Sequence, residues 1–127
     1  MPSYLFSDFK RCCIENPKGV QVLIDPENDA KNFFGLKTKT ELKDFIGNDG
    51  LEELTFINTR EWENNPDKSI TIFVDAYEFR SMYKLGYIAF MHSKKTGNWI
   101  IKSFKPSENR NKTMAIALYK AGLIEEV

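Results

Sequence analysis

Residues 87–104 read YIAFMHSKKTGNWIIKSF, and this stretch decides the fold class because it has the pattern of a β-hairpin. Two apolar segments, residues 87–92 and 98–104, flank the connector Ser93–Gly97. A connector of this length that contains glycine is typical of a hairpin between antiparallel strands. We therefore expect an antiparallel sheet in the second half of the chain.

The turn chemistry also predicts a register for this hairpin. If Thr96 and Gly97 form the turn, His92 lies opposite Ile101, and Trp99 and Ser103 share its face of the sheet. Because successive strand residues point to opposite faces, Lys102 is then expected on the other face. A site that used both His92 and Lys102 would need a β-bulge or another register.

Working outward, the remaining segments divide into helices and strands. Strands are expected at residues 20–24, 51–58 and 69–77, whereas Glu78–Gly86 reads as a helical turn or a long loop. Three helices are expected in the first half of the chain, at residues 4–15, between Asp25-Pro26 and Gly35, and from Thr38 onward. A last helix is expected from Ser107 to Gly122. Its apolar stripe consists of Met114, Ala117, Leu118 and Ala121. Helices followed by a run of strands predict a single α+β domain over residues 1–127, with N-terminal helices, an antiparallel β-meander of about four strands and a closing C-terminal helix.

Composition excludes several classes of protein. The chain has no apolar run long enough to span a membrane, and its first residues lack the pattern of a secretory signal. Its two cysteines, Cys12 and Cys13, are adjacent and have neither the spacing of a zinc site nor a plausible disulfide partner. We expect a cytoplasmic protein with structural thiols, no metal and no cofactor.

Charge is the strongest functional signal in the sequence. The totals cancel, with 18 Lys plus Arg against 18 Asp plus Glu, but all charged residues between positions 80 and 120 are basic except Glu108. The excess acid lies earlier in the chain. Such asymmetry favours binding of an anionic partner.

The basic residues are interleaved with aromatic ones, as binding of unpaired RNA bases would require. The candidate RNA-binding residues are Lys94, Lys95, Lys105, Arg110, Lys112, Tyr83 and Trp99. Lysines on exposed strands and hairpin tips also protect sheets from aggregation, so a merely solvated surface is the competing interpretation.

His92 is the only histidine and is therefore the natural candidate for proton transfer near neutral pH. No nucleophile elbow, zinc-protease motif, P-loop or dinucleotide-binding motif is present. The competing and favoured interpretation is that His92 is simply a polar residue at the end of a strand.

The segments Gly86–His92 and Trp99–Phe104, with leading helices and a lysine-rich last strand, resemble the layout of small metal-independent ribonuclease toxins of the RelE and barnase–colicin type. The resemblance covers roughly residues 70–120 and includes no diagnostic motif. It implies an acid–base role for His92, and a phosphate-binding role for Lys94, Lys102 and Arg80. The neutral net charge and the expected separation of His92 from Lys102 depart from that pattern.

A second interpretation assigns the function to the acidic residues. An immunity protein, an antitoxin or a phage-encoded inhibitor would neutralise a basic partner, with electrostatics setting the rate of association. The residues that would form this acidic patch are Asp49, Glu52, Glu53, Glu61, Trp62 and Glu63. A structural or accessory domain is the third interpretation.

Overall fold

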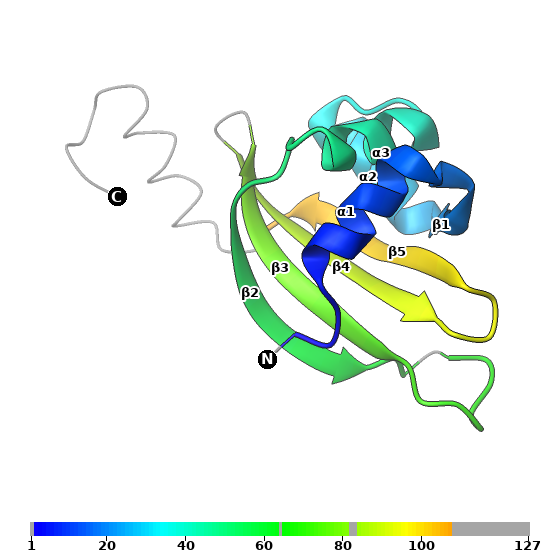
Figure 1. Cartoon of the computed structure of the whole chain (residues 1–127). Coiled ribbons are helices and arrows are strands. Elements are labelled where there is room, and N and C mark those ends of the chain that lie inside the picture. Colours follow the sequence, from blue (N-terminus) through cyan, green and yellow to red (C-terminus); the bar gives the residue numbers. More distant parts are fainter. Residues whose placement is uncertain (1, 64, 82–83, 108–127) are drawn as a thin grey trace, which may run out of the picture.

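The computed structural model describes residues 2–63, 65–81 and 84–107, and it has three α-helices and a five-stranded sheet. The elements are α1 (Phe6–Glu15), the 3₁₀ turn η1 (Pro17–Gly19), β1 (Val20–Val22), α2 (Ile24–Phe34), α3 (Lys39–Gly47), β2 (Glu52–Glu61), β3 (Phe73–Ser81), β4 (Lys84–Ser93) and β5 (Asn98–Pro106). The helices cover one face of the curved sheet (Figure 1). The α+β class is confirmed.

The sheet is mixed, with the strand order β1-β5-β4-β3-β2. Strands β2 to β5 pair antiparallel with their neighbours in the chain, whereas β1 pairs parallel with β5 at Val20–Val22. The predicted wholly antiparallel meander of about four strands is therefore wrong, because the short strand after η1 returns to the far edge of the sheet. The predicted closing helix, with Arg110 and Lys112, lies outside the described residues.

Local sequence signals account for the helix ends. Thr38 and Glu41 form a complete capping box at the start of α3, in which the Thr38 hydroxyl accepts the Glu41 N–H at 3.0 Å. Gly35 ends α2 with φ of 69°, in the left-handed region that glycine enters without steric cost. Both features are confirmed.

The main core lies between the helices and the sheet and is unusually rich in phenylalanine. Phe9 of α1 stacks on Phe90 of β4 with ring centroids 4.2 Å apart, and Phe34 of α2 packs against Phe104 of β5 at 4.9 Å. These rings fill the space beneath the helices, so this side of the sheet serves packing.

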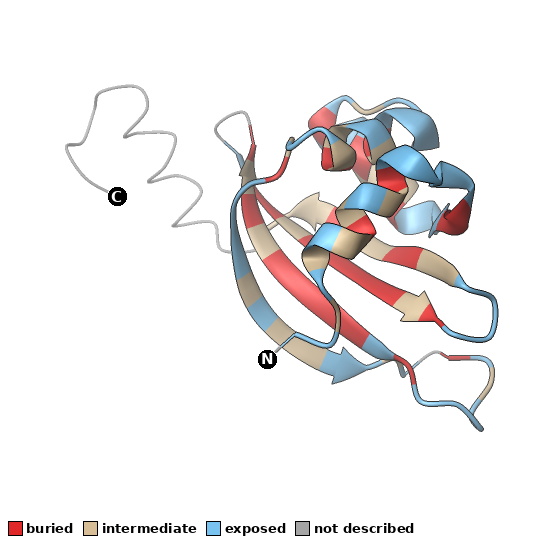
Figure 2. Ribbon diagram, viewed as in Figure 1, coloured by how far each residue is buried: buried red, intermediate tan, exposed pale blue. Residues whose placement is uncertain are grey.

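The opposite face, which we call the helix-free face, carries a smaller apolar cluster. Alternate residues of β3, β4 and β5 form it, and Trp62 and Tyr87 pack against it; the buried members are Ile72, Val74, Ala76, Ala89, Met91 and Ile100. Figure 2 shows the contrast between the buried inner strands β3 and β4 and the exposed β2. The loop after β2 is fastened to the hairpin tip by an ion pair between Lys95 and Asp67, with N and O 3.2 Å apart.

Two predictions about the strands need correction. The segment Glu78–Gly86 belongs mostly to β3 and β4, because Glu78 and Arg80 alternate with the buried Phe79. The hairpin register is also different, since His92 pairs with Trp99 and not with Ile101. The turn comprises residues 94–97, with Gly97 at φ of 74°.

Candidate functional site

The three residues expected to form a catalytic site do not come together. His92 lies on the helix-covered face beside Trp99, with ring centroids 4.7 Å apart. Lys102 lines pockets with Tyr87 and Trp62 on the helix-free face. The predicted separation of His92 from Lys102 is confirmed, although the predicted register that led to it was wrong.

A β-bulge explains the position of Lys102. Phe90 pairs with Ile101 and its neighbour Ala89 pairs with Ser103, so Lys102 is the additional residue of β5. A bulge shifts every later side chain relative to the partner strand. Ser103 therefore lies opposite Ala89, away from His92, which corrects the prediction that Ser103 and His92 share a face.

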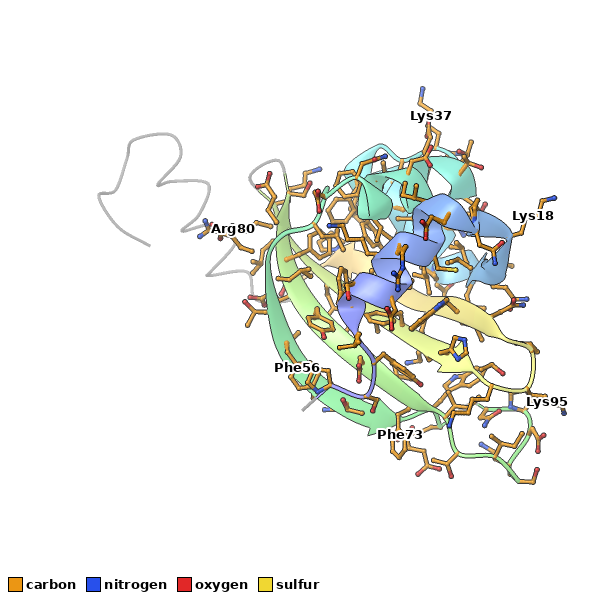
Figure 3. The ribbon with its side chains drawn as sticks, in the orientation of Figure 1. Lys18, Lys37, Phe56, Phe73, Arg80 and Lys95 are labelled. Atoms are coloured by element: carbon orange, nitrogen blue, oxygen red, sulfur yellow. The ribbon has the colours of Figure 1, made fainter. Side chains whose placement is uncertain are left out.

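Arg80 lies near the end of β3 remote from the β4–β5 hairpin tip. Its guanidinium forms an ion pair with Glu53 at 3.0 Å. Figure 3 shows Arg80 and Lys95 at opposite ends of the sheet. Arg80 is thus engaged by an acid of β2 and is distant from His92.

His92 instead borders a small pocket of about 380 Å³, together with Ser3, Tyr4 and Lys94. The Tyr4 hydroxyl donates to the Phe73 carbonyl at 2.7 Å, and burial raises the pKa of Tyr4. The phenol therefore stays protonated at neutral pH and acts as a hydrogen-bond donor. The pocket holds His92 beside a lysine and a phenol, with Lys102 and Arg80 elsewhere.

The predicted RNA-binding residues are distributed over several surfaces. Lys94 is exposed at the hairpin tip, Lys95 is paired with Asp67, and Trp99 packs into the main core against Phe9 and Phe90. Tyr83, Arg110 and Lys112 lie outside the described residues. In the described part of the chain, the predicted residues do not form one continuous basic face.

Lys105 and Lys102 do share a pocket, of about 600 Å³, which we call the Lys102 pocket. Its walls are the start of α2, the second half of β5 and Trp62, and its lining residues are Leu23, Asp25, Pro26, Asn28, Asp29, Trp62, Lys102, Ser103 and Lys105. A second pocket of about 400 Å³ adjoins it and shares Trp62 and Lys102. The Lys105 ammonium also lies 5.5 Å from the centre of the Tyr87 ring.

The acidic patch, in contrast, is gathered on one element. Glu52, Glu53 and Glu61 belong to β2, and Asp49, Trp62 and Glu63 flank it in the chain. β2 is an edge strand, because β3 is its only partner among the described residues. The structure thus brings the acidic residues to one edge of the sheet.

Ion pairs neutralise only part of this edge. Lys10 pairs with Asp49, and Arg80 pairs with Glu53. Within the described ranges, no cation forms an ion pair with Glu52, Glu61 or Glu63. The edge therefore keeps an excess of negative charge.

Two apolar residues of this edge were missed by the sequence reasoning. Leu54 is 36% exposed and Ile57 is 44% exposed, although both lie in a strand. The imperfect alternation of residues 51–58 was the available signal, because the register of β2 shifts twice in this stretch. Ile57 lies on the helix-free face, where it lines the second pocket. Both aliphatic side chains thus lie among charged residues on the edge strand.

Asp75 was also missed. It is fully buried in β3 and accepts hydrogen bonds from the backbone N–H groups of Ser3 and Tyr4 and from the Thr59 hydroxyl. The signal was a lone carboxylate within the apolar run SITIFVDAY (residues 69–77). Its role is to hold the N-terminal segment across the sheet.

In the part of the chain that the structure describes, no group of three or more His, Cys, Asp and Glu residues is placed to hold a metal ion. None of the described helices is long and apolar enough to cross a membrane. Comparison of the chain with family models, with curated proteins and with solved structures finds no match.

Proposed function

We propose that this protein is a non-catalytic protein-binding module that recognises a basic surface of its partner through the edge strand β2. The observation that carries the proposal is the composition of β2: exposed Leu54 and Ile57 lie between Glu52, Glu53 and Glu61 on one edge of the sheet. Apolar side chains among charges that are mostly of one sign, here three glutamates against Arg60, are typical of an interface with an oppositely charged partner.

Charge argues for a different protein as the partner, and against a second copy of this chain. Two β2 strands side by side would bring acidic residues together, and like charges in contact destabilise an interface. Charged side chains and bulges on edge strands also prevent such self-association. A basic partner removes this repulsion and gains rate from electrostatic attraction.

Photo-cross-linking tests the proposal with a matched control. Ile57 on β2 and Ile14 on α1 are both 44% exposed, so a photoreactive phenylalanine analogue at either position samples equally accessible surfaces. In the cells that produce the protein, position 57 should form an adduct with one discrete basic protein, and position 14 should not. The same adducts at both positions would refute the assignment of the surface.

Charge reversal then tests the chemistry with the purified partner. Glu61→Lys or Glu52→Lys should slow association about tenfold at low salt, because steering by surface charge is lost. Glu15→Lys is the control, since Glu15 is a similarly exposed acid on α1, at 68%. Equal effects of Glu15→Lys and Glu61→Lys would show that only net charge matters.

A second candidate function is the binding of single-stranded RNA on the helix-free face. The favouring observation is that Lys102 and Lys105 line a pocket with Trp62, and Lys105 lies over Tyr87. Aromatic rings beside lysines provide stacking and phosphate contacts for unpaired nucleotides. Catalysis is not part of this candidate, because His92 and Arg80 lie elsewhere.

Incubation with total cellular RNA at low and moderate salt distinguishes these functions. RNA binding predicts a salt-sensitive gel shift without cleavage, since release of counterions weakens the complex as salt rises. Discrete fragments that disappear in His92→Ala would instead support the ribonuclease interpretation. The absence of any shift, with a basic protein captured at position 57, would leave the protein-binding function alone.

A further inference from the structure

The Lys102 pocket combines three kinds of chemistry in one small volume. Lys102 and Lys105 supply ammonium groups, Asp25 and Asp29 supply carboxylates, and Trp62 supplies an aromatic surface. The volume of about 600 Å³ falls in the range of small-molecule sites, roughly 300–1,000 Å³. The pocket therefore suits a single small ligand with several distinct functional groups.

The topology of the sheet creates this pocket. Among the residues that the structure describes, β1 pairs with β5 only as far as Ile101, and the following residues of β5 lie at the sheet edge there. The chain continues from β1 into α2, whose first turns line the pocket opposite β5. Asp25, Asn28 and Asp29 have the i, i+3, i+4 spacing that places side chains on one helix face.

The β-bulge at Lys102 is an independent indication of a site. In a bulge, the additional residue is left unpaired in the hydrogen-bond ladder and its side chain is redirected. Bulges recur beside binding sites. Lys102 lines both the Lys102 pocket and the second pocket, where Glu61 and Glu63 are also lining residues, and no acid forms an ion pair with it among the described residues. Its ammonium is thus available to an anionic ligand.

The balance of charge restricts the class of ligand. Two lysines and two aspartates line the pocket, so a bare anion such as inorganic phosphate gains little from the site as a whole. A ligand that carries a phosphate and also hydroxyl donors matches both signs, because carboxylates accept hydrogen bonds from hydroxyls. The indole of Trp62 adds stacking for an aromatic ring.

We infer that the Lys102 pocket binds one ribonucleotide, with the phosphate at Lys102, the ribose hydroxyls at Asp25 and Asp29, and the base against Trp62. This inference rests on the second candidate function and names the unit that this face recognises. Free mononucleotides and a nucleotide within RNA share this chemistry. A ribonucleotide is preferred to a deoxyribonucleotide because the carboxylates accept hydrogen bonds from the 2′-hydroxyl.

NMR of the tryptophan indole N–H groups tests the inference with an internal control. Trp62 lines the pocket, whereas Trp99 packs in the main core. Adenosine 5′-monophosphate should shift the Trp62 signal in a saturable manner and leave that of Trp99 in place. Deoxyadenosine 5′-monophosphate should bind several-fold more weakly, ribose 5-phosphate more weakly still, and inorganic phosphate should produce no saturable shift.

Single substitutions distinguish a specific binding site from general electrostatic attraction of the nucleotide. Lys102→Gln should raise the dissociation constant for adenosine 5′-monophosphate about tenfold, which is the loss expected for a charge-assisted contact. Asp29→Asn should reduce the preference for the ribonucleotide. Lys18→Gln, at the exposed turn η1, should change nothing; an equal loss in Lys18→Gln and Lys102→Gln would overturn the inference.

Binding of an adenosine hexanucleotide distinguishes a failure of the mononucleotide inference from a failure of RNA binding on the helix-free face. If the hexanucleotide binds while no mononucleotide shifts Trp62 by about 10 mM, the inference is wrong and RNA binding on this face stands. If neither binds, both the inference and the second candidate function are wrong.

Discussion

The buried carboxylate of Asp75 makes the sharpest prediction about stability. Asp75 has no exposed surface, and its two oxygens accept hydrogen bonds from Ser3 N at 3.0 Å, Tyr4 N at 2.9 Å and Thr59 Oγ1 at 2.6 Å. Asp75→Asn replaces one acceptor oxygen by an amide NH₂. Whichever way the amide is turned, at least one donor of the N-terminal segment or of Thr59 then faces another donor.

The cost can be worked out from these contacts. A hydrogen bond to a charged acceptor contributes about 1.5–3 kcal/mol, and a buried donor without an acceptor costs about 1–3 kcal/mol. Removal of a buried charge offsets part of this loss. We expect Asp75→Asn to lower the free energy of unfolding by about 3 kcal/mol. Urea unfolding followed by circular dichroism should show a midpoint about 1.5 M lower, for a slope of about 2 kcal/mol per M.

A double-mutant cycle isolates the contact with the N-terminal segment. In a chain that lacks residues 2–4, Asp75 has lost both backbone donors, so Asp75→Asn should cost less than about 1 kcal/mol there. Additive effects, within about 0.5 kcal/mol, would show that Asp75 does not hold the segment in place. That result would refute the reasoning, because the coupling follows directly from the two N–H contacts.

Three further predictions concern single side chains. Gly86→Ala places a Cβ 2.2 Å from the Phe79 ring, and overpacking of this kind should lower the free energy of unfolding by about 1–3 kcal/mol in the same urea assay. Burial raises the pKa of Cys13 to about 12, so iodoacetamide at pH 8 should modify it only after unfolding, as mass spectrometry will detect. Hydrogen bonds from Ser69, and then from Lys95, lower the pKa of Asp67; this stabilisation is present above the unfolded pKa and is lost as pH falls through the folded one. Ser69→Ala should raise the Asp67 pKa in a carboxyl NMR titration, and an unchanged value would contradict the assigned cause.

The predictable parts of the fold were those set by neighbouring residues. The capping box of Thr38 and Glu41 and the end of α2 at Gly35 depend on contacts within a few positions of the chain. The hairpin between β4 and β5 was predictable for the same reason, because a short connector joins its strands. Hydrogen bonds between residues a few positions apart can therefore be predicted from the local sequence.

The errors arose where distant residues decide the outcome. A strand was expected at residues 20–24 and β1 covers Val20–Val22, but nothing near it specifies parallel pairing with β5. The turn of residues 94–97 set the register of His92 near the hairpin tip, and the bulge at Lys102 shifted the register of the following residues; no residue type marks such a bulge in a single sequence. Tertiary packing selects both features.

The ion pairs of the candidate site residues were also unpredictable, because their partners are distant in the sequence. Arg80 and Lys95 read as parts of a basic cluster, yet acids from other segments, Glu53 and Asp67, pair with them. A run of basic residues in the sequence becomes a basic surface only if the fold keeps acids away from it. The acidic residues 49–63 stayed together because they follow one another along a single strand and its flanks.

Because of the strand order, the acidic residues and the lysines that are separate in the sequence also lie on different strands of the sheet. In the order β1-β5-β4-β3-β2, two inner strands separate the acidic β2 from the lysines of β5. Within the described residues, β1 pairs with only the first part of β5, whereas β2 lies along the opposite edge of the sheet. The separation is not complete, because Glu61 and Glu63 line one pocket with Lys102 on the helix-free face. The neutral net charge of the chain, which departs from the pattern of ribonuclease toxins, is therefore the sum of an acidic edge strand and of a lysine-bearing strand beyond the two inner strands.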